Sequence, residues 1–217
     1  MWVWPIPGEP GPDVGLGSPE VSLIYRVMYR IGFTPWDTGV VPEELSALVE
    51  GDEALPAGRA LDIGCGTGTQ SVYLAQHGWR VTAIDAAGRP LVQARARADA
   101  AHVDVEWLNA DVSELASLGI EPGLTLAFDR GCFHGLNDRE RAAYAAGVTS
   151  LAAPGATLLL MSFAPSRVPG GPRGVEDTEL AARFDGWALS ATQPDNDGDP
   201  AGPMRNVPRH WYRLTRR

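Results

Sequence analysis

The stretch from Leu61 to Asp85, LDIGCGTGTQSVYLAQHGWRVTAID, decides the fold. It combines an apolar strand, a glycine-rich turn, a short helical segment, a second strand and a terminal carboxylate. From Arg59 onward the sequence alternates between strand and helix patterns, which is typical of a parallel sheet with crossover helices. We predict an α/β fold with strands at 59–63, 80–84, 103–108, 124–129 and 156–163, and helices at 69–77, 88–100, 112–118 and 138–152.

Both ends of the chain add elements to this core. We expect residues 1–18 to be a flexible lead-in, followed by one helix that begins at Ser18-Pro19-Glu20 and a second helix at 42–51. After residue 163 the sequence predicts a loop, a short helix near 176–184, and two strands that flank the acidic stretch at 195–203. Two such strands at the end of the chain favour an antiparallel closing pair.

The composition limits the classes of function. The 217 residues carry a formal net charge of −9, from 27 acidic residues against 18 arginines and no lysine, which does not favour a nucleic-acid partner. The missing lysines exclude Schiff-base chemistry and a Walker-type phosphate site. Only Cys65 and Cys132 are present, so we expect a cytoplasmic location and neither a disulfide framework nor a bound metal. No apolar run approaches the ~18 residues that cross a bilayer, so we expect no membrane partner.

The glycine turn points to a ligand with an amino end and a ribose. Gly64, Gly66 and Gly68 let the backbone turn sharply and approach a ligand closely. Their spacing is GxGxG, whereas the dinucleotide motif is GxGxxG and holds a pyrophosphate. Asp62 would repel a pyrophosphate but suits an ammonium group. Asp85, at the end of the second strand, is placed to accept hydrogen bonds from ribose hydroxyls.

LDIGCGTG followed by this acid resembles the class I S-adenosylmethionine-dependent methyltransferases, over residues 59–163. The resemblance implies a Rossmann-like, seven-stranded sheet that is mostly parallel with an antiparallel last strand, helices on both faces, and the first and fourth strands adjacent at its centre. It also implies one methyltransferase domain at 19–217. This domain would comprise N-terminal helices and a lid at 19–51, the cofactor-binding core at 59–163, and an acceptor loop with the closing strands at 164–217.

The resemblance assigns S-adenosylmethionine as the cofactor and implies which residues bind it. Asp62 and the turn would hold the methionine moiety, and Asp85 with Ala86 the ribose. Asp111 with Val112 beside it would contact the adenine, although Asp111 in front of Val-Ser-Glu also suits a helix cap. The segment from Asp129 and Arg130 to Cys132 would run along the cofactor. The implied cofactor set is therefore Trp36, Asp62, Gly64, Cys65, Gly66, Thr67, Gly68, Asp85, Ala86, Asp111, Val112, Asp129 and Arg130.

A second motif lies before the first strand. FTPWDTG, at 33–39, is similar to a segment of the thiol and halide methyltransferases, with thiopurine methyltransferases as more distant relatives. Some methyltransferases that act on phenols and quinones share it. The resemblance implies that Trp36 is a lid residue that positions donor and acceptor, with Asp37 orienting it. The alternative is that Trp36 only packs the N-terminal helices on the sheet.

The methyl acceptor is less determined by the sequence. Methyl transfer from a sulfonium requires alignment above all, so a thiolate or halide needs no general base, whereas a phenol often does. With an ordinary pKa of about 6.5, His134 is a candidate base, or else it lines the pocket without proton transfer. The residues expected to contact the acceptor are Phe33, Cys132, Phe133, His134, Phe163 and Arg167.

Three functions follow from these residues. The first is methyl transfer to a small molecule, with a thiol or related soft nucleophile as the acceptor. The second is O-methylation of a phenol or quinol-type compound. The third is a catalytically silent protein that binds S-adenosylmethionine. For each of them we expect a monomer or homodimer with a small-molecule partner, no nucleic acid and no membrane.

Overall fold

The computed structural model describes residues 39–217, apart from residue 53, residues 169–170 and residues 196–203. Several predicted features lie outside this part of the chain. They are the lead-in at 1–18, the first N-terminal helix, the segment with Phe33, Trp36 and Asp37, and most of the acidic loop at 195–203.

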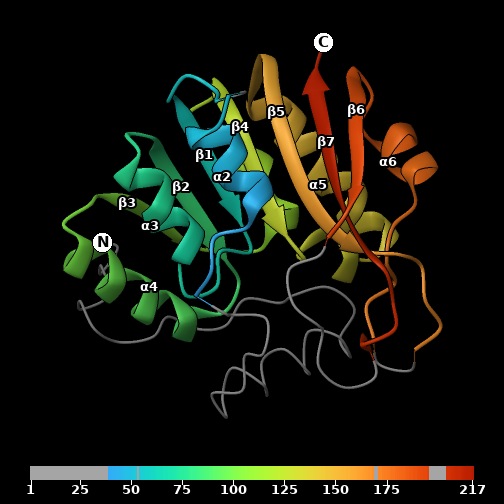
Figure 1. Cartoon of the computed structure of the whole chain (residues 1–217), viewed down its shortest axis with the longest axis horizontal. Coiled ribbons are helices and arrows are strands. Elements are labelled where there is room, and N and C mark those ends of the chain that lie inside the picture. The colour runs from blue at the N-terminus through green and yellow to red at the C-terminus, as the bar shows by residue number, and fades with distance from the viewer. Residues whose placement is uncertain (1–38, 53, 169–170, 196–203) are drawn as a thin grey trace.

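A seven-stranded sheet with the order β3-β2-β1-β4-β5-β7-β6 lies at the centre of the molecule (Figure 1). The strands are β1 (Arg59–Ile63), β2 (Arg80–Asp85), β3 (Val105–Asn109), β4 (Leu124–Arg130), β5 (Ala152–Phe163), β6 (Trp187–Pro194) and β7 (Arg209–Arg216). Strands β1 to β5 pair in parallel, whereas β7 runs antiparallel to both of its neighbours, β5 and β6. The predicted α/β fold, with an antiparallel last strand and with β1 beside β4, is confirmed.

Helices cover both faces of the sheet (Figure 1). They are α2 (Glu43–Glu50), α3 (Thr69–Gln76), α4 (Gly88–Ala101), α5 (Asp138–Leu151) and α6 (Asp177–Arg183), with the 3₁₀ helices η1 (Val112–Ser117) and η2 (Phe133–Gly135). Leu45 of α2 and Leu74 of α3 are fully buried in the apolar cluster on one face. Tyr144 of α5 and Leu180 of α6 are fully buried in the cluster on the other face.

The sandwich explains the continuous apolar run in β5. Leu158 and Leu160 belong to the cluster that contains α5 and α6, whereas Leu159 belongs to the cluster that contains α2 and α3. Because successive side chains of a strand point to opposite faces, a strand that is covered on both sides needs apolar residues at every position.

Three predicted elements differ from the structure in type or by more than one residue at an end. The segment predicted as a helix at 112–118 is a short 3₁₀ helix. Strand β3 begins at Val105 rather than at 103, because His102 adopts a left-handed conformation and the Val103 amide donates to the carbonyl of Ala98. Strand β5 begins at Ala152 rather than at 156, because Ala152 pairs with Leu124 before the register shifts.

Candidate functional site at the carboxyl edge of the sheet

The glycine turn follows the carboxyl end of β1, at the edge where open parallel sheets bind ligands. Gly64, Gly66 and Gly68 all have positive φ, at 73°, 53° and 77°. A Cβ atom at Gly64 would lie 2.8 Å from the Cβ of Cys132, and one at Gly68 would lie 2.6 Å from the Trp107 ring. The turn therefore requires glycine for its backbone conformation and for its close packing. The backbone at Gly64 is exposed, whereas Thr67 and Cys65 of the same turn are buried.

Asp85, at the end of β2, fastens this turn. One carboxylate oxygen accepts a hydrogen bond from the Gly66 amide at 2.8 Å, and the other accepts from the Ala87 amide at 2.8 Å. The side chain is only 6% exposed, and the neighbouring Ala86 is buried. A carboxylate offers about four acceptor sites, so Asp85 can hold the turn and accept further donors. Asn109 at the end of β3 also contacts this edge, because its amide donates to the carbonyls of Asp85 and Ala86.

Asp62 in β1 contacts the helix that follows the turn. Its carboxylate accepts a hydrogen bond of 2.5 Å from the Ser71 hydroxyl in the first turn of α3, where the preceding Gly68 has no side chain to cap the helix. Burial raises the pKa of Asp62 from 3.8 to about 7, the Ser71 hydroxyl opposes this rise, and Asp129 and Asp85 add to it. A carboxyl group with this pKa is readily ionised by a nearby cation.

Asp111 caps the 3₁₀ helix η1. Its Oδ1 accepts a hydrogen bond from the Ser113 amide at 2.8 Å, as the capping alternative expects. The Asp111 side chain stays partly exposed, so capping leaves the rest of the carboxylate near the surface. Val112 is 1% exposed, and its side chain lies in the core.

The side chain of Asp129 is turned into the protein. The carboxylate is fully buried and accepts hydrogen bonds from the amides of Cys132 and Phe133 and from the Tyr144 hydroxyl, at 2.7, 3.0 and 2.9 Å. Burial raises its pKa to about 6, and these donors oppose the rise. The Asp129 carboxylate therefore shapes the turn after β4. Sequence reasoning missed Tyr144, which follows the helical period of α5 like an ordinary core residue.

The side chain of Phe133 is also turned into the protein. Its ring is fully buried, lies 5.0 Å from the Tyr144 ring and 5.9 Å from the Phe184 ring, and is covered by the Arg141 guanidinium at 5.1 Å. A side chain enclosed in this way is part of the core and does not line an acceptor pocket.

The two cysteines lie near each other and are not poised for reaction. Cys132 is partly exposed and packs against Gly64, and Cys65 is buried, as expected for a small residue that fills the turn. Burial and nearby carboxylates raise the pKa of both thiols well above the ordinary value, so both remain protonated at neutral pH.

His134 lies in η2 after β4 and is almost completely enclosed. It is 3% exposed, its ring lies 5.2 Å from the Phe163 ring, and Gly131 packs against its edge. Nδ1 is buried without a hydrogen-bond partner in the described part of the chain. Burial, and secondarily Arg141, lowers the pKa of His134 to about 3, so the ordinary value assumed from the sequence does not hold. The imidazole is neutral at pH 7 and is a weak base.

Val40, one of the first residues that the structure describes, is anchored at this same edge. The carbonyl of Val40 accepts hydrogen bonds from Gln70 in α3 and from Arg130 at the end of β4, both at 3.3 Å. Val40 is therefore tied between the glycine turn's helix and the end of β4. Trp36 and Phe33 lie outside the described residues. Arg167, in the loop after β5, is exposed.

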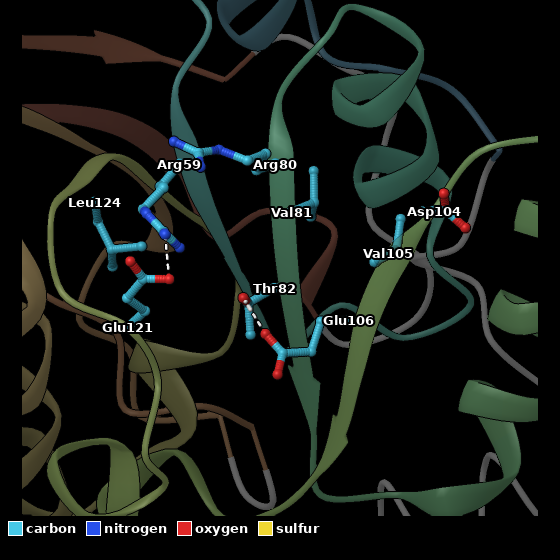
Figure 2. A pocket seen from close by; sticks show the side chains of 9 residues that line it. All are labelled: Arg59, Arg80, Val81, Thr82, Asp104, Val105, Glu106, Glu121 and Leu124. Carbon is cyan, nitrogen blue, oxygen red and sulfur yellow. Dashed lines mark hydrogen bonds and ion pairs between the residues drawn. The ribbon is translucent and has the colours of Figure 1, made fainter.

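An open groove of about 370 Å³ lies away from this site. Figure 2 shows its side chains at the amino ends of β1, β2 and β3, where Arg59 is paired with Glu121 and Thr82 donates to Glu106 at 2.7 Å. Arg59 and Glu106 therefore each have a partner there. Among the residues that the structure describes, no group of three or more His, Cys, Asp or Glu side chains is arranged to hold a metal ion, and no helix could span a membrane.

Comparison with known proteins identifies the domain that carries the glycine turn. The sequence profile of a family described as "Methyltransferase domain" matches residues 60–155. A 2-heptyl-1-hydroxyquinolin-4(1H)-one methyltransferase of Mycobacteroides abscessus is 29% identical over 150 residues. This match covers 67% of this chain and 64% of the relative, so the aligned stretch spans less than two thirds of that protein.

Solved structures share the fold. A structure described under "Conversion of a Disulfide Bond into a Thioacetal Group during Echinomycin Biosynthesis" superposes with a TM-score of 0.69 at 24% identity, covering 89% of this chain and 92% of the other. The 1,6-didemethyltoxoflavin-N1-methyltransferase of Burkholderia thailandensis, with bound S-adenosylhomocysteine, gives 0.70 at 22% identity, covering 94% and 93%. Residues 60–155 thus match a methyltransferase domain, and the chain shares the fold of a methyltransferase that was solved with bound S-adenosylhomocysteine.

Proposed function

We propose that this chain, built around an S-adenosylmethionine-dependent methyltransferase domain, methylates a small molecule that ionises readily, either a thiol or an acidic hydroxyl. The observation that carries the proposal is the glycine turn after β1, which exposes Gly64 and is fastened to the end of β2 by the hydrogen bond from the Gly66 amide to Asp85. A cofactor with a ribose and an amino acid moiety matches this edge better than a pyrophosphate, because Asp62 and Asp85 lie there. The cofactor supplies an electrophilic methyl group on a sulfonium.

In this proposal, different residues of the site bind different parts of the cofactor. The raised pKa of Asp62 suits a carboxyl that ionises when an ammonium group approaches. Gly64 and Gly66 let the methionine moiety approach the backbone, and Asp85 accepts from the ribose hydroxyls. Asp111 uses one oxygen as a helix cap, and in this proposal the carboxylate also accepts the adenine amino group.

The acceptor side follows β4, along Gly131, Cys132 and His134. The anchoring of Val40 beside Arg130 supports the proposal that the FTPWDTG segment, with Phe33 and Trp36, serves this side. Trp36 would exclude water and align the two reactants, which is the main requirement of an in-line displacement.

The state of His134 supports an acceptor that ionises readily. A neutral imidazole with a pKa of about 3 cannot remove a proton efficiently from a weakly acidic phenol at neutral pH. It can instead form a hydrogen bond with the acceptor through a ring nitrogen. The buried Nδ1 has no other hydrogen-bond partner in the described part of the chain. An acceptor that loses its proton easily needs no general base, so this hydrogen bond is sufficient. The M. abscessus relative, named for a substrate with an N-hydroxyl group, supports this class.

A methyl-transfer screen tests the proposal. Wild-type protein with S-adenosylmethionine is incubated with 2-heptyl-1-hydroxyquinolin-4(1H)-one, thiophenol, phenol and aniline, and methylated products are measured by mass spectrometry. We expect turnover of the hydroxyquinolone or the thiol, and at most slow reaction of phenol and aniline. Calorimetry with S-adenosylhomocysteine accompanies the screen, and Asp85→Ala should weaken binding at least about tenfold, since hydrogen bonds to a charged group are lost. No binding by wild type, or equal binding by the variant, would sink the proposal.

A second candidate is O-methylation of an ordinary phenol or quinol, which the position of His134 at the carboxyl end of β4 favours. It requires His134 to act as a general base. Fast turnover of phenol that is lost in His134→Gln would establish this candidate and would exclude the acidic-acceptor class. Tight S-adenosylhomocysteine binding without any turnover would instead indicate a silent binding protein.

A further inference from the structure

We propose that Arg141 is a positioning residue that sets the acceptor side of the site, an inference that rests on the proposed function. Arg141 lies in α5 and its side chain is fully buried. Its guanidinium uses all five of its N–H donors. Nε donates to Leu136, Nη2 donates to the carbonyls of His134 and Gly174, and Nη1 donates to both carboxylate oxygens of Glu179, at 2.8–3.0 Å.

These partners come from three separate segments of the chain. His134 and Leu136 belong to the turn after β4, Gly174 ends the loop that follows β5, and Glu179 belongs to α6. Three of the acceptors are backbone carbonyls, so the contacts fix the path of the chain in addition to side-chain positions. The planar fork of an arginine can bridge such segments, whereas the single ammonium group of a lysine cannot.

The Gly174 contact controls where the loop after β5 returns to the sheet. Gly174 has a φ of 73°, and a Cβ atom there would lie 2.3 Å from the carbonyl oxygen of Ala164. The next amide, that of Val175, donates to the carbonyl of Phe163 at 2.9 Å. The loop therefore leaves and re-enters at the same point, and Arg141 holds this point against the turn that carries His134.

Phe163 and His134 are the two side chains that this arrangement brings together, with ring centroids 5.2 Å apart. Phe163 is the last residue of β5, and His134 lies in η2 after β4. Both side chains are expected to contact the acceptor. None of the Arg141 hydrogen bonds reaches the glycine turn, Asp62 or Asp85. Loss of Arg141 should therefore misplace the acceptor while the cofactor still binds.

The test compares Arg141→Lys with Arg183→Gln, a matched control from the same ion-pair cluster. Arg183 binds Glu179 and Asp138 at 2.7 and 2.5 Å, but it contacts no carbonyl of the η2 turn or of Gly174. Arg141→Lys should raise the KM of the acceptor identified by the screen about tenfold, because small misplacements of a reactant are costly. Its Kd for S-adenosylhomocysteine should stay within about twofold of wild type, and Arg183→Gln should change neither value.

Two further measurements distinguish a failure of this inference from a folding defect and from a failure of the proposed function. If Arg141→Lys does not fold, Glu179→Gln weakens the hold on the same guanidinium, and its acceptor KM should rise in the same direction. If wild type methylates nothing, the proposed function fails, and hydrogen exchange still tests Arg141. The Leu136 and Val175 amides should then exchange faster in Arg141→Lys than in Arg183→Gln. Equal acceptor KM values, or equal exchange in the two variants, would overturn the inference.

Discussion

Substitution of Asp62 by asparagine tests the link between the cofactor and the buried carboxylates. In the free protein, burial raises the pKa of Asp62 from 3.8 to about 7. At 1.36 kcal/mol for each pKa unit, this rise corresponds to about 4 kcal/mol that disfavours the charged form. If the ammonium group of the cofactor lies against Asp62, its charge favours the ionised carboxylate. Binding then releases the Asp62 proton wherever the pH is below about 7.

The expected change of the Kd with pH follows from the ionised fraction of Asp62. This fraction falls from about 0.9 at about pH 8 to about 0.1 at about pH 6, so the Kd of wild type should rise about tenfold between them. Asp62→Asn cannot ionise and should lack this dependence. At about pH 8 it should bind about tenfold more weakly than wild type, since it loses a charge-assisted hydrogen bond, and near pH 6 the two proteins should converge.

Isothermal titration calorimetry with S-adenosylhomocysteine measures both quantities. Titrations in two buffers with different ionisation enthalpies count the released protons, which should be about half a proton more for wild type than for Asp62→Asn at about pH 7. The amino group of the ligand titrates with both proteins, so the difference isolates Asp62. An identical pH dependence in wild type and variant would refute the reasoning, and Asp62 would then serve only to cap α3 through Ser71.

Three further substitutions report on the site's framework. Gly64→Ala should destabilise the protein more than Gly155→Ala in urea unfolding. Both glycines have φ between 73° and 79°, but only a Cβ at residue 64 meets another atom, Cys132 Cβ at 2.8 Å. Tyr144→Phe should lower the free energy of unfolding by about 1–3 kcal/mol, because it leaves the buried Asp129 carboxylate without one donor. The stability of wild type relative to His134→Gln should fall as the pH drops from about 6.5 toward 3, since only unfolded His134 then binds a proton. The opposite slope would contradict a neutral, buried His134.

The periodicity of the sequence was sufficient for the sheet and insufficient for the polar contacts that shape the site. Apolar runs and glycines located β1, β2 and β4 to within one residue, because these features depend on local pattern. Arg141 and Tyr144 were missed, since a helical repeat does not reveal which polar side chain is buried by a distant loop. The assumed pKa of His134 failed for the same reason, because desolvation arises only after β4, β5 and α5 have packed together.

Four carboxylates lie at or just beyond the carboxyl ends of four neighbouring strands, and each accepts a hydrogen bond from the turn or helix that follows its own strand. They belong to Asp62, Asp85, Asp111 and Asp129. The same acids that organise the loops therefore gather negative charge at one edge. Part of this gathering is unfavourable, because Asp129 and Asp85 raise the pKa of Asp62. A ligand that carries an ammonium and a sulfonium relieves this repulsion when it binds. The acids thus shape the turns in the empty protein, and their repulsion becomes a preference for a cationic cofactor over a pyrophosphate.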